Sequence, residues 1–406
     1  MASYSDALKY LEQLEVFGMK LGLENITELC RKLGNPQSAY KTIHVTGTNG
    51  KGSVTAMCAS ILEQAGYKSG MYTSPHLQTI RERIQVNGRK ITQKEFLDYF
   101  LKVKGKSGEL KEKGMRATHF EFVTAMALLF FKEQACDFAI LEVGLGGRLD
   151  ATNVVKPLVA VITNIELDHT QHLGDTKEKI ALEKAGIIKR NCITVTGEKS
   201  EVIKQIFRKV CKERGSRLIE VKKDYSGKIL LLGKHQRANA AVAVAAIKSL
   251  GKYGIKITDK AIRRGIETTK WPGRLEIVQQ RPTVILDGAH NPSKAKTAAD
   301  YLKKLGKKTI LVVGISFDKD IPNTMMTLAS FAKKIIITRA KYRGTDCSIL
   351  KREAVKYRKE EEVEIIEDVR EAVKKAIREA KDEIVMVTGS LFVVGEARDL
   401  WYKEKS

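Results

Sequence analysis

The sequence predicts an α/β protein of two domains. Short apolar runs alternate along the chain with segments of helical period, which is typical of helices layered on both faces of a mostly parallel sheet. The 406 residues are long for one hydrophobic core and sufficient for two. A Pro-Gly turn within residues 268–274 interrupts the alternation, which then resumes. We therefore expect a first domain over residues 1–270, a linker over 271–280 and a smaller α/β domain over 281–406.

The individual elements follow from the same patterns. In the first domain, apolar runs predict strands over residues 42–46, 68–73, 137–143, 158–163 and 192–196. Segments of helical period predict helices over residues 53–64, 120–133, 176–187, 201–214 and 236–250. In the second domain, strands are predicted over residues 283–287, 309–313, 334–338, 362–366 and 384–388, each beside a helix-like run.

The composition is that of a globular protein without a membrane partner. Charged residues make up 30% and apolar residues 43% of the chain, and no apolar run approaches the ~18 residues of a transmembrane helix. The first residues lack a basic stretch followed by an apolar one, so no secretory signal is predicted. The six cysteines are scattered without a C-x-x-C pair, which favours buried thiols over a zinc site or disulfides. We expect a cytoplasmic protein.

The net charge of +24 first suggests nucleic-acid binding. However, the basic residues are dispersed among acids, as in residues 351–362, and no helix-turn-helix or aromatic-basic strand motif stands out. Such a surface is more typical of a solvated protein that attracts anionic small molecules. We expect no nucleic-acid partner. The alternative from another class is a nucleotide-gated nucleic-acid binder, which would show salt-sensitive oligonucleotide binding.

The most informative stretch is VTGTNGKGS at residues 45–53. A strand, a glycine-rich turn and a helix in that order form a phosphate cradle. Backbone N–H groups turn inward, the helix N-terminus adds partial positive charge, and Lys51 adds a full one. The usual pattern places Ser or Thr directly after the lysine, whereas here Gly52 intervenes before Ser53. The pattern predicts a nucleoside triphosphate, an enzyme or a motor, and a P-loop NTPase-like first domain.

Polar residues follow several other predicted strands. Glu142 ends one strand, and Ser74 and His169 follow two others. Ligands of open α/β sheets bind beyond the carboxyl ends of the strands, so we expect these side chains near the cradle, where Mg²⁺ would find suitable ligands. A turn-capping acid and a surface histidine are the alternatives for Glu142 and His169 taken alone. Asp287 ends a strand of the second domain, and either a ribose contact in a Rossmann-like fold or a plain turn explains it.

Together the motifs resemble one family, folylpolyglutamate synthase/dihydrofolate synthase, the folate branch of the Mur ligase superfamily. They occur in the family's order over residues 42–292, whereas the last third of the chain carries weaker markers. The motifs are GTNGKGS at 47–53, SPHL at 74–77, THFE at 118–121, EVGLGGRLDATN at 142–153, DH at 168–169, EKAGI at 183–187, HQ at 235–236 with Asn239, WPGR at 271–274 and DGAHNP at 287–292.

The resemblance implies an ATP-dependent ligase that joins L-glutamate to a folate or to dihydropteroate. A carboxylate resists attack by an amine because its leaving group is poor. ATP would convert it to an acyl phosphate with release of ADP, and the glutamate amine would then displace phosphate. Cations must screen the repulsion between the carboxylate and the γ-phosphate, a role for Lys51 and Mg²⁺. The partners would be small molecules, and we expect a monomer.

The resemblance also assigns residues. The implied nucleotide contacts are Thr48, Asn49, Gly50, Lys51, Gly52, Ser53, Asn239, Arg274, Asp287 and His290. The implied ligands of two Mg²⁺ ions are Ser53, Ser74, Glu142 and His169, and a monovalent cation is a further candidate. Thr118, Phe120 and Asp150 match the pterin pocket. Lys184 matches a lysine that is carbamylated in many relatives, with a solvated helix lysine as the alternative. Lys51, His169 and Lys184 are thus the expected catalytic residues.

Some questions stay open at this point. The nearest alternative is a Mur-type ligase with a different carboxylate acceptor, although THFE and LDATN favour folate. The segment after His169 reads TQHLG, where bacterial members more often have an acid and an aromatic residue. The sequence decides neither between dihydropteroate and folate nor the length and linkage of a glutamate tail. The purpose of the +24 charge is equally open.

Overall fold

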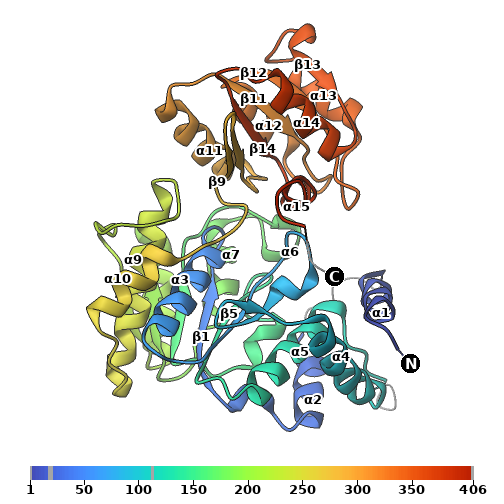
Figure 1. Ribbon diagram of the computed structural model, residues 1–406. Helices are drawn as coiled ribbons and strands as arrows, with labels where there is room; N and C mark the ends of the chain where they lie inside the picture. Colours follow the sequence, from blue (N-terminus) through green and yellow to red (C-terminus); the bar gives the residue numbers. More distant parts are fainter. Residues whose placement is uncertain (1, 17–21, 111–113, 404–406) are drawn as a thin grey trace. The chain divides into compact units, whose positions relative to one another are not determined.

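The computed structural model describes residues 2–16, 22–110 and 114–403, and Figure 1 shows it as a ribbon coloured along the chain. The chain forms two compact units. The first comprises residues 1–74, 81–230 and 236–269, and the second comprises residues 75–80, 231–235 and 270–406. The last boundary between the two units falls between residues 269 and 270. Two short segments from earlier in the chain also belong to the second unit, which the sequence did not indicate.

The first unit is built on an eight-stranded sheet in the order β4-β3-β2-β5-β1-β6-β7-β8. Six neighbouring strands run parallel, and β3 and β4 form an antiparallel edge. All five strands expected from the sequence are present, so the mostly parallel sheet is confirmed. The strands are β1 (Lys41–Thr46), β2 (Ser69–Tyr72), β3 (Ile84–Val86), β4 (Arg89–Lys90), β5 (Phe138–Glu142), β6 (Val159–Ile162), β7 (Ile193–Thr196) and β8 (Arg217–Glu220).

Side-chain caps begin several helices of this unit. Thr92 and Thr118 each form a capping box with a glutamate three residues later, at the starts of α4 and α5. The helices are α1 (Tyr4–Val16), α2 (Glu24–Lys32), α3 (Lys51–Gln64), α4 (Gln93–Gly108), α5 (His119–Glu133), α6 (Thr170–Leu173), α7 (Lys177–Ala185), α8 (Glu201–Glu213), α9 (His235–Ser249) and α10 (Asp259–Thr268). The described 3₁₀ turns are η1 (Pro36–Ser38), η2 (Ile80–Arg83), η4 (Ala151–Val154) and η5 (Leu250–Tyr253).

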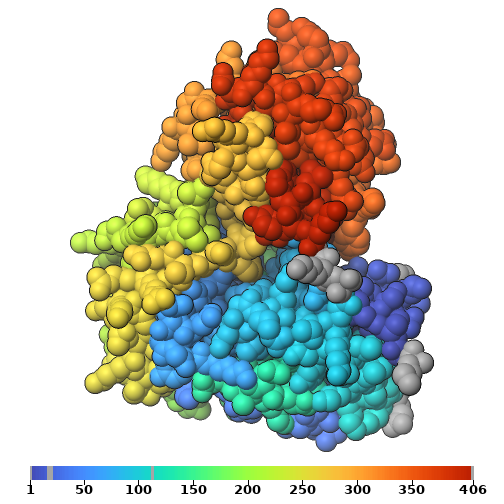
Figure 2. All heavy atoms as spheres, in the orientation of Figure 1, coloured from blue at the N-terminus to red at the C-terminus, as the bar shows by residue number. Residues whose placement is uncertain are grey.

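Helices α3 and α10 lie side by side, and Figure 2 shows their residues in contact on one face of the first unit. Ser60 of α3 donates a hydrogen bond from its Oγ to the carbonyl oxygen of Gly265 at 2.9 Å. A Cβ atom on Gly265 would lie only 2.5 Å from Cα of Ile61. The glycine therefore permits the close approach that places α3, and with it the cradle, firmly on the unit.

The second unit contains a six-stranded sheet in the order β13-β12-β11-β14-β10-β9. Among these described strands only β9 runs antiparallel, paired with β10. Residues 276–280, expected to lie in a linker, form β9, because they pair with the following strand as a hairpin. The strands are β9 (Glu276–Gln280), β10 (Thr283–Leu286), β11 (Thr309–Val313), β12 (Ala332–Ile337), β13 (Val363–Ile365) and β14 (Ile384–Thr388). The helices are α11 (Pro292–Leu305), α12 (Ile321–Ala329), α13 (Cys347–Ala354), α14 (Val369–Glu379) and α15 (Leu391–Arg398), with a 3₁₀ turn η6 (Glu360–Glu362).

Both faces of this second sheet are covered. Alternate residues of β14 enter two different apolar clusters, with Ile384 and Met386 in one and Val385 and Val387 in the other. Helices α11, α12 and α13 contribute to the first cluster, and α14 and α15 to the second. Because side chains of a strand alternate between faces, the two clusters are the two cores of a helix–sheet–helix sandwich. The Rossmann-like expectation for the second domain is confirmed.

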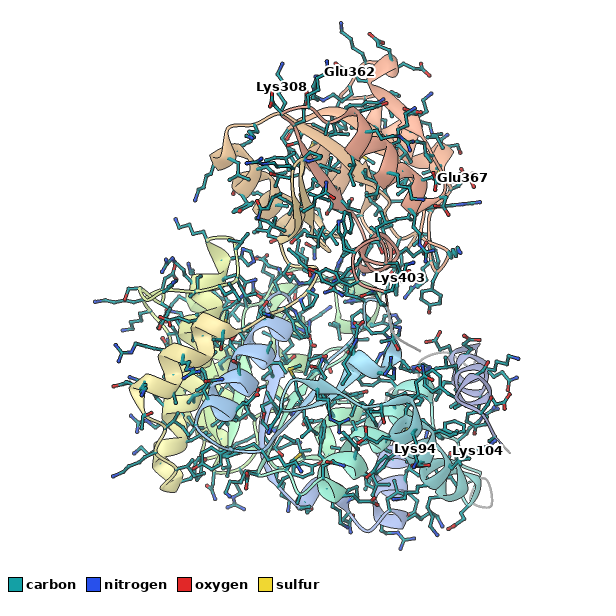
Figure 3. The ribbon with its side chains drawn as sticks, in the orientation of Figure 1. Lys94, Lys104, Lys308, Glu362, Glu367 and Lys403 are labelled. Carbon is teal, nitrogen blue, oxygen red and sulfur yellow. The ribbon has the colours of Figure 1, made fainter. Side chains whose placement is uncertain are left out.

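Exposed lysines occur on both units. Lys94 and Lys104 on α4 and Lys308 before β11 are exposed and belong to different units (Figure 3). Positive charge is therefore dispersed over both units. Within the described ranges, no helix combines the length and the apolar character that crossing a bilayer requires.

The candidate site follows from the ends of three neighbouring strands of the first sheet. In the register, Val45 of β1 pairs with Glu142 of β5, and Thr46 of β1 pairs with Ile162 of β6. The three parallel strands therefore end at one edge. The loops that leave this edge carry the polar residues predicted from the sequence.

Candidate active site

The loop between β1 and α3 is held by the segment that follows β6. The backbone N–H groups of Thr48 and Asn49 donate to the main chain and side chain of Asn164, both at 2.9 Å. Thr163 Oγ1 donates to the carbonyl oxygen of Asn49 at 2.6 Å. Gly47 has φ 145°, and a Cβ atom there would overlap the Thr163 hydroxyl. The cradle is thus a rigid loop whose shape depends on glycine.

Helix α3 starts without a capping side chain. Its N-cap residue, Gly50, has φ 82°, and no side chain accepts from the amides of the first turn. These first-turn amides come from Lys51, Gly52 and Ser53, and they have no intrahelical acceptor. Uncapped amides at the N-terminus of a 14-residue helix form a place for an anion. A Cβ atom on Gly50 would collide with the Asn239 side chain, so Asn239 closes the loop from α9.

Two lysines meet at the same carbonyl group. Lys51 Nζ donates to the carbonyl oxygens of Gly47 and Thr48 at 2.9 and 3.2 Å. Lys184 Nζ, from the end of α7, donates to the Gly47 carbonyl at 3.0 Å. Lys184 is buried, and burial together with the charge of Lys51 lowers its pKa to about 7. The site therefore combines one fixed cation with an amine that titrates near neutrality.

Ser53 is buried at the start of α3 and is oriented by α9. Gln236 Nε2 donates to Ser53 Oγ at 3.3 Å. Gln236 is held in turn by Asn239, whose Nδ2 donates to Gln236 Oε1 at 2.9 Å. Asn239 thus fixes Gln236, and Gln236 fixes the orientation of the Ser53 hydroxyl. Gln236 stands in the HQ motif, to which the resemblance assigns no role. Its spacing of three residues from Asn239, which places both on one helix face, is the sequence signal that indicates it.

Glu142 and Ser74 lie together at the end of their strands. The buried Glu142 carboxylate accepts a hydrogen bond from the Ser74 backbone N–H at 3.1 Å. His169 has left-handed backbone geometry, φ 51°, and its Nε2 lies 3.8 Å from Asp168 Oδ1. Among the described residues, no group of three or more His, Cys, Asp and Glu side chains has the geometry to enclose a metal ion.

A Mg²⁺ ion nevertheless suits these side chains. Magnesium prefers oxygen ligands, takes one or two carboxylates from a protein and completes its shell with phosphate oxygens and water. The buried carboxylate of Glu142 and the hydroxyls of Ser53 and Ser74 are ligands of that kind. They fit an ion that arrives with a phosphate and do not fit a closed structural metal site.

A pocket of about 20 Å³ lies beside the start of α3. Residues of the cradle, of the loop after β5, and Asp168, His169 and Lys184 line it. Its size suits one water-sized group, such as an ion or a phosphate oxygen. The structure therefore brings Lys51, His169 and Lys184 to one small pocket, and Glu142 lies one residue before the lining begins.

The residues assigned to a pterin lie beside the loop after β5. The ring of Phe120 contacts Gly144 so closely that a Cβ atom there would lie 2.6 Å from the ring. Thr118 is the N-cap of α5, and its hydroxyl accepts from the Glu121 backbone at 3.3 Å. Asp150 is buried; its Oδ2 accepts from the Leu145 backbone N–H at 2.9 Å and its Oδ1 from that of Thr152 at 3.0 Å. Burial raises the pKa of Asp150, and these bonds oppose the rise.

The second unit holds its own group of assigned residues. Asp287 accepts hydrogen bonds from the backbone N–H groups of Leu275 and Ala289 at 2.8 and 3.0 Å. A Cβ atom on Gly288 would lie 2.6 Å from Arg274 Nη1, so the guanidinium lies over this turn. His290 Nδ1 donates to the Gly288 carbonyl at 2.8 Å, and Lys294 Nζ donates to its Nε2 at 3.0 Å. Burial holds the pKa of His290 well below its usual value, so the ring is neutral.

The domain architecture and the relatives define a class of protein. Residues 45–222 match the Mur ligase middle domain and residues 273–391 match the Mur ligase glutamate ligase domain. The chain is therefore a Mur-type ligase.

Its closer kinship is equally clear. It is 36% identical to dihydrofolate synthase/folylpolyglutamate synthase of Bacillus subtilis, with 98% of each chain covered. The structure of Escherichia coli FolC in complex with DHPP and ADP matches with a TM-score of 0.89 and 33% identity, over 98% of this chain and 97% of that one. The Yersinia pestis bifunctional folylpolyglutamate synthase/dihydrofolate synthase with AMPPNP and Mn matches with a TM-score of 0.87 and 32% identity, over 98% of each chain. The chain belongs to the folylpolyglutamate synthase/dihydrofolate synthase family of ATP-dependent amide ligases.

Proposed function

We propose that this chain uses ATP to join L-glutamate to a folate, to dihydropteroate, or to both, through an acyl phosphate. The observation that carries the proposal is the convergence of Lys51 and Lys184 on the Gly47 carbonyl, beside the uncapped start of α3. Two negatively charged groups, a carboxylate and a γ-phosphate, must approach each other in the first step. Fixed positive charge in a partly buried pocket lowers the barrier to that approach.

The phosphate-binding role belongs to residues 48–53 with Asn239. The backbone amides of Gly52 and Ser53 and the helix dipole attract the phosphates, while Asn239 closes the loop. Lys51 supplies a full charge at the γ-phosphate. In the second unit, Arg274 is suited to a phosphate, and Asp287 and the neutral His290 are suited to the ribose and the adenine. Support for these last assignments comes from the family motif and from the rigid turn that holds the three side chains.

The proposed metal ligands are Ser53, Ser74, Glu142 and His169, for two Mg²⁺ ions, with a monovalent cation as a further candidate. A bound divalent ion would supply charge neutralisation between the phosphate and the acceptor carboxylate. The residues themselves provide a carboxylate and a hydroxyl held by fixed hydrogen bonds. The complex of a relative with Mn and AMPPNP supports a divalent ion together with the nucleotide.

Lys184 is proposed to react with CO₂ and form a carbamate. Only a neutral amine attacks CO₂, and a pKa of about 7 leaves about half of the amine neutral at pH 7. The carbamate would replace a charge that is disfavoured beside Lys51 with an anionic oxygen ligand. Mass spectrometry under native conditions with ¹³C-bicarbonate tests this: a labelled adduct absent from Lys184→Ala supports it, and no adduct in either protein contradicts it.

The proposed acceptor pocket is formed by Thr118, Phe120 and Asp150. The Phe120 ring offers a flat apolar face for a pterin, and Asp150 offers a carboxylate for its amino-pyrimidine edge. The complex of E. coli FolC with DHPP and ADP supports a pterin-type acceptor.

The protein is further proposed to act in the cytoplasm as a monomer. Its six cysteines are all buried and free, which suits a reducing compartment.

Product analysis tests the function. The protein is incubated with ATP, glutamate and one acceptor from a panel of dihydropteroate, tetrahydrofolate and an unrelated carboxylate, and the products are weighed by mass spectrometry. Addition of glutamate to a pteroate acceptor with stoichiometric ADP supports the proposal. Turnover with the unrelated carboxylate alone would instead indicate a Mur-type ligase with another acceptor.

A further inference from the structure

His44 lies in the middle of the central strand β1 and is fully buried. Its Nε2 lies 2.8 Å from Thr152 Oγ1, and its Nδ1 has no hydrogen-bond partner within the described residues. A buried nitrogen without a partner destabilises the fold. An apolar side chain at position 44 would avoid that cost. What histidine adds at this position is therefore the hydrogen bond made by Nε2.

The bond from His44 is the first in a series of hydrogen bonds that runs through Thr152 to Asp150. Thr152 Oγ1 donates to Asp150 Oδ1 at 2.5 Å. A hydroxyl has one hydrogen, so Thr152 must accept from His44, and the proton of His44 therefore lies on Nε2. Burial, with a contribution from the charge of Lys189, lowers the pKa of His44 to about 3, so this ring is neutral at physiological pH.

The series ends in the wall of the pocket. Asp150 Oδ2 accepts from the backbone N–H of Leu145, which lines the pocket with Gly144 and Gly146. Thr46, two residues after His44 and on the same face of β1, donates to the Gly146 carbonyl at 2.7 Å. The central strand therefore holds the loop after β5 at two points. One point is direct, through Thr46, and the other runs from His44 through Thr152 and Asp150.

We propose that His44 is a positioning residue for the acceptor site, which it serves by orienting Asp150 and the loop of residues 144–146 through Thr152. The inference rests on the proposed function, because that function assigns the acceptor to Asp150 and Phe120. The Phe120 ring contacts Gly144 of the same loop. If the loop lost its hold on Asp150, both the Asp150 carboxylate and the Phe120 ring would shift. The cradle would keep its shape, because Thr163 and Asn164 hold it.

Kinetics of two His44 variants test the proposal. His44→Leu removes the donor, and His44→Gln keeps an N–H group that reaches Thr152. We expect His44→Leu to raise KM for the pteroate acceptor about tenfold and to leave KM for ATP within about twofold, as suits the loss of a hydrogen bond to a charged network. His44→Gln should return the acceptor KM to within about threefold of the unaltered protein. Thermal melting confirms that each variant is folded.

Thr152→Val provides the second arm. It should raise the acceptor KM as much as His44→Leu does, and the double variant should be no worse than either single one, because both changes break the same series. Thr194→Val is the matched control: Thr194 is a buried threonine of β7 whose hydroxyl bonds to Ser216 at 2.8 Å, away from the pocket, and its loss should leave the acceptor KM unchanged.

The outcomes separate this inference from the function on which it rests. Nitrogen NMR of His44 reports the position of its proton without any turnover, and a proton on Nδ1 would overturn the inference. So would equal increases in KM for ATP and acceptor, additive effects of His44→Leu and Thr152→Val, or no recovery in His44→Gln. Absence of an amide product from the unaltered protein with every pteroate acceptor would instead overturn the proposed function.

Discussion

Lys51 and Lys184 donate hydrogen bonds to one oxygen atom, the carbonyl of Gly47, at 2.9 and 3.0 Å. One lysine begins α3 and the other ends α7, so two distant parts of the chain bring positive charge to a single loop. Two ammonium groups this close repel each other, which adds to burial in lowering the pKa of Lys184. A polyanion or a carbamate on Lys184 would relieve the repulsion. The pair is therefore the feature on which the proposed binding of ATP phosphates and the proposed carbamate both depend.

Lys51→Ala should reduce turnover at least about 10³-fold, because it removes a positive charge that belongs to the cradle itself. The fold should remain intact, since the change also removes a repulsion with Lys184. Phosphate release in the presence of acceptor measures the first effect, and thermal melting measures the second. Lys94→Ala, which removes an exposed lysine of α4, is the control and should keep full activity. Retained turnover in Lys51→Ala would reject the role assigned to this lysine.

Lys184→Met should flatten the pH dependence of the free energy of unfolding. The pKa of Lys184 is about 7 in the folded chain, against an ordinary value of 10.5. Between these values the unfolded chain binds more protons, so this lysine makes stability rise as the pH increases from about 7 to about 10.5. Below about pH 7 its effect is a constant destabilisation. Denaturant titrations across this range measure the slope.

The matched control for that slope is Lys177→Met, which changes a half-exposed lysine of the same helix, paired with Glu166. Lys177→Met should show the same pH dependence of the free energy of unfolding as the unaltered protein. An identical slope in Lys184→Met and in the unaltered protein would show that Lys184 is protonated normally in the folded state, contrary to its burial.

Gly47→Ala should destabilise the protein by about 2–4 kcal/mol and abolish nucleotide binding, because a Cβ atom would overlap Thr163 Oγ1 and the φ of 145° is unfavourable for alanine. Gly105→Ala is the control. Gly105 lies inside α4 with open space where a methyl group would stand, so alanine should be neutral or stabilise by up to about 1 kcal/mol. Urea denaturation and calorimetry with ADP measure both. If Gly47→Ala were as stable as Gly105→Ala, the loop would accommodate the added Cβ atom, and the prediction would be wrong.

Glu142→Gln should weaken Mn²⁺ binding in the presence of AMPPNP by about 10- to 100-fold, because an amide is a poorer ligand than a carboxylate for a hard cation. Binding of AMPPNP without metal should change little. Glu220→Gln is a fair comparison, since Glu220 also ends a parallel strand but pairs with Arg208. Equal metal affinity in the two variants would exclude Glu142 from the metal site.

Much of the fold was predictable because its signals are local. The apolar runs of β1, β5 and β6 and the glycine-rich turn before α3 lie in continuous sequence, so the edge that carries the site followed directly. Strand β9 was missed because none of its residues is fully buried and it is defined by its partner β10. Residues 75–80 gave no sign that they belong to the second unit, since that depends on contacts with residues more than three hundred positions later, such as Gln78 with Arg398.

The candidate site likewise contains residues that local sequence patterns indicate and residues that only the structure reveals. Lys51, Glu142 and Lys184 stand in motifs and could be named from the sequence, although their mutual distances could not. The contact between Ser53 and Gln236 joins residues 183 positions apart and leaves no local pattern. His44 stands within an apolar run, and a single histidine in such a run carries no indication of its partner. Burial and bonding in three dimensions supply what the residue type alone does not.

The central claim is that the acceptor carboxylate becomes an acyl phosphate before the amide forms. An acceptor labelled with ¹⁸O in that carboxylate tests it directly. The account predicts that the phosphate released with ADP contains one ¹⁸O atom for each amide formed, because the oxygen that bridges carbon and phosphorus leaves with the phosphate. Unlabelled phosphate from a reaction that still yields the amide would contradict it.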